Sequence, residues 1–379
     1  MPQDALARFD ADPEHSFTLP GSYYHDADVY GREMPAIFYR AWQYACHVSL
    51  LAEPGDYFVR DIGDQSVVVL RGDDGELRAF HNVCQHRAHR LLEGQGPLDG
   101  QGRAPGVVIC PYHGWTYELG GALKYAPDSG AVAGFDKGGF CLSPVRIDSL
   151  CGFVFFNLDP DARPMAEVYA GLEDEIRSFS PNVDKLTQTS RHEYPMAANW
   201  KNAVENFSEC YHCPGQHKGL VAGGLDLDSY SIAIHDAHHS HTSRGKGDAS
   251  QYPAGDHAAP RSQEFGGWLI WPNLSLEVYP GGYLNIFHHT PAGPEKTVQV
   301  IEWYFADETP AAERQEVVDF MHTVRIEDIP ICESVQRGLH SMGYSQGRFM
   351  VDAARSAFSE HAVHDFQLKV ARSLGLIAA

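Results

Sequence analysis

Two pairs of cysteine and histidine residues have the types and the spacing of metal ligands. Cys84 and His86 form a C-x-H pair, and Cys110 and His113 form a C-x-x-H pair. Thiolates and imidazoles in this order suit a [2Fe–2S] cluster with two cysteines on one iron and two histidines on the other. Because imidazole is neutral where thiolate is charged, such a cluster accepts an electron more readily than an all-cysteine cluster. The motif therefore predicts a one-electron relay.

The residues around these ligands separate this reading from a zinc site. Two cysteines and two histidines also suit tetrahedral zinc, but zinc fingers space their ligands C-x2-4-C and H-x3-5-H. Here the segments read CQHR and CPYHGW, each after a short apolar run, which predicts two hairpin tips around one cluster. Both halves resemble the motif of the Rieske family. The 23 residues between His86 and Cys110 exceed the usual spacing, and the Gly- and Pro-rich stretch 94–106 predicts a surface loop that accommodates them.

A second set of candidate ligands is Glu209, His212 and His217. A helix through this segment would place Glu209 and His212, three residues apart, on one face. Pro214 and Gly215 would interrupt that helix, so that His217 turns back toward the same metal. Two histidines and one carboxylate on one face of an iron leave positions open for dioxygen. On the residues alone, Glu209 could be the carboxylate ligand.

The segment ENFSECYHCPGQH resembles the catalytic-iron segment of Rieske non-heme iron oxygenases, α subunits in particular. The resemblance implies that His212 and His217 bind a mononuclear Fe(II). It implies that Glu209 is instead the bridge through which an electron arrives from the cluster of a neighbouring subunit. Asn206 matches an asparagine that lies beside the iron without binding it.

In this family the third iron ligand is an aspartate on a downstream helix. The segment IEDIPICESVQ resembles that helix and places Asp328 at the ligand position. Glu327 and Glu333 are the alternative carboxylates in the same segment. The resemblance further implies a homotrimer, dioxygen as co-substrate, and NAD(P)H electrons delivered by a separate flavin or iron–sulfur reductase.

The segments WPNLSLEVYP, GPEKTVQVIEWYF and IEDIPICESVQRGL resemble the branch of this family that acts on quaternary ammonium compounds. This branch oxidises glycine betaine, proline betaine, carnitine or choline. The expected reaction is a monooxygenation of an N-methyl group that releases formaldehyde, with proline betaine or glycine betaine favoured as substrate. The alternatives are an aromatic ring-hydroxylating dioxygenase and, more distantly, a non-enzymatic Rieske electron carrier.

A quaternary nitrogen has no N–H to donate, so aromatic faces are expected to recognise it. The strand-like region 268–305 is rich in aromatic residues and is expected to line the pocket. A substrate carboxylate is expected to meet one of the two adjacent histidines there. The candidate residues are Trp268, Trp271, Tyr279, Tyr283, Phe287, His288 and His289, of which we select Trp271, Tyr279, Phe287 and His289.

Alternating apolar runs and turn signals predict antiparallel hairpins over 57–82 and 140–158. Helices are expected near 165–179, 199–211, 311–322, 328–340 and 360–374, around the strands of 268–305. We therefore expect an α+β chain. Its expected parts are an N-terminal segment (1–40) packing on the catalytic domain, a small antiparallel β Rieske domain (41–160), and a helix-grip (START-like) catalytic domain (161–379).

Composition excludes some partners. The chain has 379 residues and a net charge of −21, which argues against nucleic acid, because a phosphate backbone requires a basic surface. No apolar run is long enough for a membrane span and no export signal is evident, so a cytoplasmic location is expected. The cysteines other than the cluster ligands are expected as reduced thiols, with Cys46, Cys141, Cys151 and Cys332 buried and Cys210 and Cys213 used in packing. The cluster His235, His238, His239 and His241 is expected in a polar loop near the pocket mouth.

Overall fold

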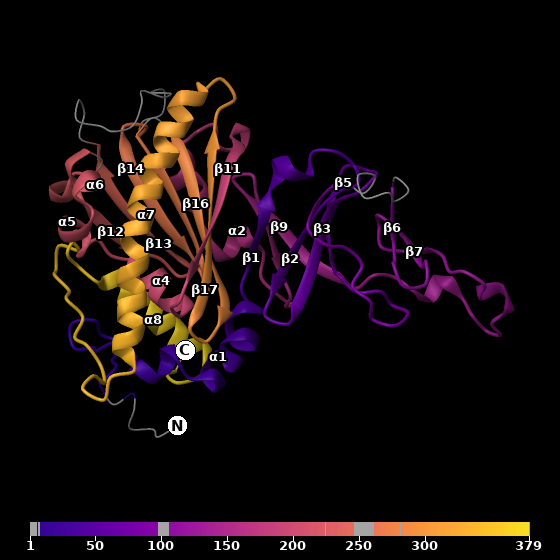
Figure 1. Cartoon of the computed structure of the whole chain (residues 1–379), viewed down its shortest axis with the longest axis horizontal. Helices are drawn as coiled ribbons and strands as arrows, with labels where there is room; N and C mark the ends of the chain where they lie inside the picture. The colour runs from indigo at the N-terminus through magenta and orange to yellow at the C-terminus, as the bar shows by residue number, and fades with distance from the viewer. Residues whose placement is uncertain are drawn as a thin grey trace. The chain divides into compact units, whose positions relative to one another are not determined.

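A computed structural model describes residues 6, 8–97, 106–223, 225–245, 261–280 and 282–378. The chain divides into two compact units (Figure 1), one of residues 39–165 and one that joins the N-terminal segment to residues 166–379. The antiparallel sheets and flanking helices of these units confirm the predicted α+β class. The unit boundaries lie at 38/39 and 165/166, beside the expected 40/41 and 160/161.

The unit of residues 39–165 is built on antiparallel strands. Its larger sheet has the order β1-β10-β9-β4-β3-β2-β5, and a three-stranded sheet has the order β6-β7-β8. The apolar side chains of the two sheets form a core around Tyr57, Leu70 and Tyr117. The strands are β1 (Gln43–His47), β2 (Asp56–Ile62), β3 (Gln65–Arg71), β4 (Leu77–His81), β5 (Gln95–Pro97), β6 (Val107–Ile109), β7 (Thr116–Glu118), β8 (Leu123–Tyr125), β9 (Pro144–Leu150) and β10 (Phe153–Asn157).

The prediction of a surface loop over 94–106 is wrong for its first residues, which form β5. β5 pairs with β2 through Phe58 and Gln95 and so extends the larger sheet. Gln95 and Gly96 lack the alternating apolar pattern of a strand, which explains why the sequence did not indicate one. The rest of the loop, residues 98–105, lies outside the described residues.

The second unit contains a seven-stranded antiparallel sheet of order β11-β17-β16-β15-β14-β13-β12. A long helix, α7 (Ala311–Leu339), lies lengthwise along one face of this sheet (Figure 1). The strands are β11 (Thr187–Met196), β12 (Ser231–Ile234), β13 (His238–Arg244), β14 (Glu264–Ile270), β15 (Leu274–Tyr279), β16 (Tyr283–Gly293) and β17 (Lys296–Phe305). The other helices are α1 (Ala27–Glu33), α2 (Met165–Val168), α3 (Leu172–Phe179), α4 (Trp200–Phe207), α5 (Cys213–Gln216), α6 (Lys218–Gly223) and α8 (His361–Ser373).

The two helices predicted at 311–322 and 328–340 are one continuous helix. Pro330 lies inside α7, where a proline removes one backbone hydrogen bond and would be expected to kink or end the helix. The helix nevertheless buries one face at intervals of three or four residues, through Val317, Met321, Asp328 and Cys332 among others. This long packed face holds the helix together across the proline.

The helix predicted over 199–211 ends at Phe207. Asn199 caps its first turn by accepting a hydrogen bond from the backbone N–H of Lys201 at 3.0 Å. Pro214 does not break a helix, because it lies in the first turn of the separate helix α5, where proline is favoured. Likewise the helix predicted over 165–179 is split into α2 and α3 by Gly171, whose φ is +82°.

A buried ion pair joins the N-terminal segment to the rest of the second unit. Lys201 Nζ lies 2.6 Å from Glu33 Oε1, and both side chains are fully buried. Trp200 Nε1 donates to the other oxygen of Glu33 at 2.8 Å. Among the residues that the structure describes, no helix has the length and apolar composition to cross a membrane.

Candidate metal centres

The four predicted cluster ligands lie in two tight turns of the unit of residues 39–165. One turn follows β4 and is closed by a hydrogen bond from the N–H of Cys84 to the carbonyl of His89 at 2.8 Å. The other follows β6 and is closed by a 2.8 Å bond from the N–H of Cys110 to the carbonyl of Trp115. Gly114 has a φ of +72°, which explains the glycine of CPYHGW.

The donor set of these turns fits an iron–sulfur cluster. Cys84 and Cys110 are buried, whereas His86 and His113 are exposed with ring centroids 4.7 Å apart. Tyr117 Oη lies 3.2 Å from Cys84 Sγ, and burial together with Cys84 raises the pKa of the Cys110 thiol. Thiols in such surroundings become thiolates when they bind metal. The histidine side of the site is therefore the side open to solvent, where an electron could pass.

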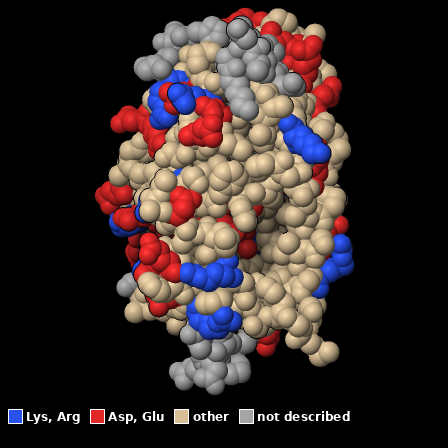
Figure 2. All heavy atoms as spheres, turned by 90° about the vertical axis from the view of Figure 1, so that its left-hand side faces the viewer, with Lys and Arg blue, Asp and Glu red and all other residues tan. Residues whose placement is uncertain are grey.

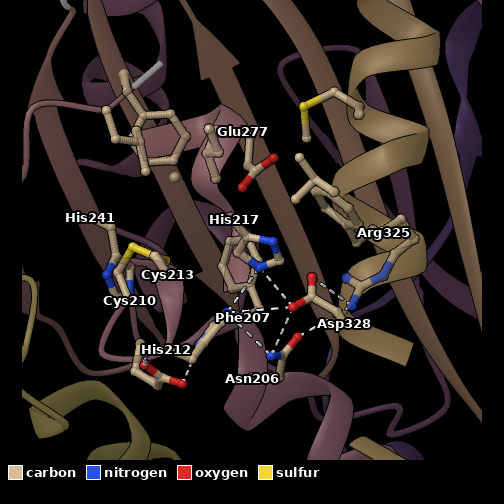
Figure 3. A pocket seen from close by; sticks show the side chains of 18 of the residues that line it. Asn206, Phe207, Cys210, His212, Cys213, His217, His241, Glu277, Arg325 and Asp328 are labelled. Atoms are coloured by element: carbon tan, nitrogen blue, oxygen red, sulfur yellow. Dashed lines mark hydrogen bonds and ion pairs between the residues drawn. A yellow bond between two sulfur atoms is a disulfide. The ribbon is translucent and has the colours of Figure 1, made fainter. Parts of the chain in front are cut away.

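The second unit brings His212, His217 and Asp328 together around one point (Figure 3). The Nε2 atoms of His212 and His217 are 3.1 Å apart. Asp328 Oδ1 lies 2.9 Å from His217 Nε2 and 3.4 Å from His212 Nε2. With metal–ligand bonds of about 2.1 Å, atoms at these separations subtend angles of roughly 90–110° at a shared ion. The three side chains thus fit one iron and would leave its other face open.

Two carboxylates orient the histidines through Nδ1, the ring nitrogen that points away from the candidate metal position. Glu209 Oε1 lies 2.5 Å from Nδ1 of His212, and Glu327 Oε2 lies 2.8 Å from Nδ1 of His217. Each therefore accepts the Nδ1 proton and leaves Nε2 for the metal. Of the alternative carboxylates, Glu327 is thus directed at the far nitrogen of a histidine. Glu333 instead accepts a hydrogen bond from the backbone N–H of Ala197 at 2.9 Å.

Asn206 and Arg325 complete the surroundings of Asp328. Asn206 Nδ2 donates to Asp328 Oδ1 at 3.2 Å, and Arg325 pairs with the other oxygen of Asp328 at 2.8 Å. Burial acts to raise the pKa of Asp328, but Arg325 and the two histidines hold it far below its ordinary value. Burial lowers the pKa of His212, but Asp328 and Glu209 outweigh this effect and raise it to about 9. The side chains of this site therefore create a negative electrostatic potential that attracts a cation.

A pocket with a cavity volume of about 70 Å³ opens onto these three side chains between α7 and the sheet. Figure 2 shows a hollow on this side of the unit with acidic atoms visible inside it. Of the predicted substrate residues, Tyr279 and Phe287 line the pocket. The lining that the sequence did not indicate includes Phe207, Tyr230, Phe265, Glu277 and Arg325, whereas His241, expected near the pocket mouth, does line the pocket.

Trp271 and His289 do not line this pocket. Trp271 follows the end of β14 and packs on Phe366 with ring centroids 5.8 Å apart. His289 is fully buried and hydrogen-bonded through both ring nitrogens, to Ser275 and Gln299. His288 is also buried, with Nε2 3.3 Å from Asn273 Nδ2. None of these side chains is among the lining of this cavity, so their contact with a substrate stays a prediction that the pocket does not support.

The predicted polar loop of histidines is a buried strand. His238, His239 and His241 lie on β13 and are buried; burial lowers the pKa of His241 to about 4, so its imidazole is neutral. His235 precedes this strand and is exposed. The sequence of this strand, HHSHTSR, has no apolar pattern from which a buried strand could be recognised.

Two expectations for cysteines are also wrong. Cys210 and Cys213, expected as packed thiols, form a disulfide that lines the pocket. Cys141 is exposed, whereas Cys46, Cys151 and Cys332 are buried as expected.

Comparison with known families agrees with both centres. The Rieske [2Fe–2S] domain family matches residues 41–136. The family of the ring hydroxylating alpha subunit (catalytic domain) matches residues 183–375. The chain belongs to the Rieske oxygenase α subunits, and the predicted family and its cofactors, a [2Fe–2S] cluster and a catalytic iron, are confirmed.

Relatives that match nearly the full chain belong to one branch of this family. The carnitine monooxygenase oxygenase subunit of Escherichia coli (strain K12) is 36% identical, covering 94% of both chains. The chloroplastic choline monooxygenase of Beta vulgaris is 31% identical over 93% of this chain and 76% of its own. A crystal structure of a quaternary ammonium Rieske monooxygenase in complex with L-carnitine superposes with a TM-score of 0.85 at 34% identity, covering 98% of this chain and 99% of the other.

Proposed function

We propose that this chain is the oxygenase component that hydroxylates an N-methyl group of a small quaternary ammonium compound, with proline betaine or glycine betaine as favoured substrates. The observation that carries the proposal is the aromatic wall of the pocket beside the three candidate iron ligands. Tyr230, Phe265, Tyr279 and Phe287 all line it. Aromatic faces attract a cation that can form no hydrogen bond, by about 0.5–2 kcal/mol for each contact.

The relatives support a substrate with this charge. Carnitine and choline, the compounds named in those proteins, both carry a trimethylammonium group, as does glycine betaine. The aromatic-ring dioxygenase and the electron carrier are the less favoured alternatives. A carrier has no use for His212, His217 and Asp328.

We propose that His212, His217 and Asp328 hold the catalytic iron, and that Cys84, His86, Cys110 and His113 hold the cluster. The iron, when bound, activates dioxygen with electrons that a separate flavin or iron–sulfur reductase takes from NAD(P)H. The protein's own contribution is positional. Glu209 and Glu327 fix the ligand tautomers, Asn206 and Arg325 fix the carboxylate, and the aromatic wall excludes water and holds a methyl group near the open face of the iron.

The proposed reaction balances with one dioxygen, two electrons and two protons. One oxygen atom is inserted into a C–H bond of the N-methyl group, and the other leaves as water. The resulting N-hydroxymethyl compound breaks its C–N bond and releases formaldehyde, the demethylated amine and a proton. A monooxygenase that instead hydroxylates another carbon of the substrate consumes the same electrons but releases no formaldehyde.

Oxygen uptake with a compatible reductase tests this proposal. The substrates are glycine betaine, proline betaine, carnitine, choline and naphthalene, with formaldehyde and the amine product quantified. One formaldehyde for each dioxygen consumed with a betaine supports N-demethylation. Oxygen uptake that yields a product with all its N-methyl groups would refute it, and a cis-diol from naphthalene would favour the aromatic dioxygenase.

We also propose a homotrimer in which Glu209 carries the electron from the cluster of one subunit to the iron of the next. One solved relative is described as revealing inter-subunit electron transfer. Mixing tests this arrangement: His113→Ala should abolish the cluster of one chain, and Asp328→Ala the iron site of the other. Co-assembled chains should regain activity that neither variant has alone, and absence of any recovery in verified mixed trimers would contradict transfer between subunits.

A further inference from the structure

Glu277 is a buried acid of the pocket to which the iron chemistry gives no role. It lies on β15, its side chain is 9% exposed, and it lines the same cavity as the three candidate iron ligands. Figure 3 shows its carboxylate directed into this pocket, on the side of His217. A carboxylate beside the aromatic side chains of this pocket is unusual, because burying a carboxylate costs free energy and such groups are rarely found without a charged partner.

The partners of Glu277 hold it in place without neutralising it. Tyr279 Oη donates to Glu277 Oε2 at 2.7 Å, and Asn285 Nδ2 donates to the same oxygen at 3.1 Å. Both donors are uncharged. Within the described parts of the chain, no lysine, arginine or histidine forms an ion pair with Glu277. Arg325, the cation of this pocket, is engaged by Asp328 at 2.8 Å.

Glu277 therefore has no cation within ion-pair distance, and Arg325 of the same pocket acts on it only through longer-range electrostatics, which lowers its pKa. Burial raises the pKa of this carboxyl to about 7, although Tyr279 and Asn285 act in the opposite direction. A cation placed in the pocket would supply the missing charge and favour the ionised form. Tyr279 and Asn285 both donate to Oε2, and among the described residues no other side chain donates a hydrogen bond to Oε1.

We propose that Glu277 is the counter-ion that selects a cationic substrate, with the quaternary nitrogen held between this carboxylate and the aromatic rings of Tyr279 and Phe287. This inference rests on the proposed function and names the residue that gives it charge selectivity. A quaternary ammonium group attracts a carboxylate without a directional hydrogen bond. The protein must therefore orient the carboxylate itself, which is what Tyr279 and Asn285 do.

A matched control exists in the same sheet. Glu302 on β17 is 1% exposed and accepts a hydrogen bond from Tyr304 Oη at 2.6 Å, two residues along the strand, as Glu277 does from Tyr279. Unlike Glu277, it also pairs with a cation, since Arg191 Nε lies 3.5 Å from its Oε1. Glu302 does not line the pocket. Glu302→Gln therefore reports the effect of neutralising a buried carboxylate of this sheet away from the substrate.

The experiment measures binding rather than turnover. Choline and 3,3-dimethylbutan-1-ol differ only in that a neutral carbon replaces the charged nitrogen. Calorimetry under anaerobic conditions on the iron- and cluster-loaded protein gives their dissociation constants for wild type, Glu277→Gln and Glu302→Gln. We expect wild type and Glu302→Gln to prefer choline, and Glu277→Gln to lose roughly tenfold or more of that preference, with binding of the neutral alcohol unchanged.

Three results would overturn the proposal: a wild-type protein with no preference for choline, a Glu277→Gln variant that keeps the preference, or equal weakening of both compounds. If Glu277→Gln does not fold, Glu277→Asp keeps the charge and should retain most of the preference. The preference of the wild-type protein for choline over the neutral alcohol is in any case measured without a variant. Failure of N-demethylation is seen separately, since it leaves charge-selective binding intact while formaldehyde is absent.

Discussion

Glu209 and Glu327 occupy equivalent positions behind the two candidate iron-binding histidines. Glu209 lies 2.5 Å from His212 Nδ1, and Glu327 lies 2.8 Å from His217 Nδ1. Only Glu209 is proposed to carry the electron as well. Replacing each with glutamine therefore separates an effect on iron affinity from an effect on electron transfer.

Both variants should bind iron less tightly. Removing the carboxylate behind a ligand histidine costs about 10–100-fold in metal affinity, which corresponds to about 1.4–2.7 kcal/mol. Glutamine keeps a neutral acceptor, so we expect losses near the lower end. The Glu327 side chain is 37% exposed and that of Glu209 14%, so Glu327→Gln should lose less. Competition for Fe(II) with a chromogenic chelator measures both values.

Electron transfer is measured after each variant has been saturated with Fe(II). The reduced cluster is mixed with substrate and dioxygen, and its reoxidation is followed by its visible absorbance in a single turnover. Glu327→Gln should reach the wild-type rate once iron is saturating. Glu209→Gln should remain slower by roughly 10–100-fold, the equivalent of a charge-assisted hydrogen bond worth about 1.5–3 kcal/mol.

Equal slowing in both variants at full iron occupancy would show that the two carboxylates act only by orienting the ligands. A wild-type rate in Glu209→Gln would remove the bridge from the proposed mechanism. Cluster content, measured as acid-labile sulfide, should be the same in all three proteins and serves as the internal control.

Two further predictions concern stability. Lys201→Met leaves the buried Glu33 carboxylate without its charged partner and should lower the free energy of unfolding by about 3–5 kcal/mol. The control Arg177→Met breaks half-exposed ion pairs of the same unit and should lower it by no more than about 1 kcal/mol. Urea unfolding measures both values, and equal losses would contradict the burial argument. Burial raises the pKa of Glu205 to about 7 from 4.5, so the folded state binds this proton more tightly and stability falls as pH rises between these values. Glu205→Gln should remove up to about 1.4 kcal/mol per pH unit of that slope, and an unchanged slope between roughly pH 5 and pH 7 would show that Glu205 is not responsible.

The ligand segments could be read from the sequence because their geometry is local. In the cluster turns, Cys84 and His86 are separated by one residue and Cys110 and His113 by two, so a single turn fixes each pair. Asp328 is 111 residues from His217, and only the resemblance to a known helix assigned it. Local reasoning about that helix failed at Pro330, because its stabilising face is defined by packing against the sheet.

The pocket could not be read because it depends on which face of each strand is turned inward. Glu277 and Tyr279 on β15 face the cavity, two residues apart, as Phe265 and Gly267 do on β14. Alternation assigns residues to one of two faces but does not say which face meets the helices. Gly267 illustrates the difficulty: a Cβ there would lie 3.0 Å from the Phe265 ring, so the absence of a side chain shapes the pocket and leaves no pattern of its own.

The charges of the pocket give a reason for an acid at position 277. The charged residues that line it are Glu209, Glu277, Arg325 and Asp328, and with all four ionised their formal charge is −2. A ferrous ion would bring the total to zero. Without Glu277 the same pocket would have one negative charge fewer beside a cationic substrate, in surroundings where water screens little. In its proposed role Glu277 offsets the charge of a quaternary ammonium group that shares one pocket with an iron, and a substrate without charge would have no need of it.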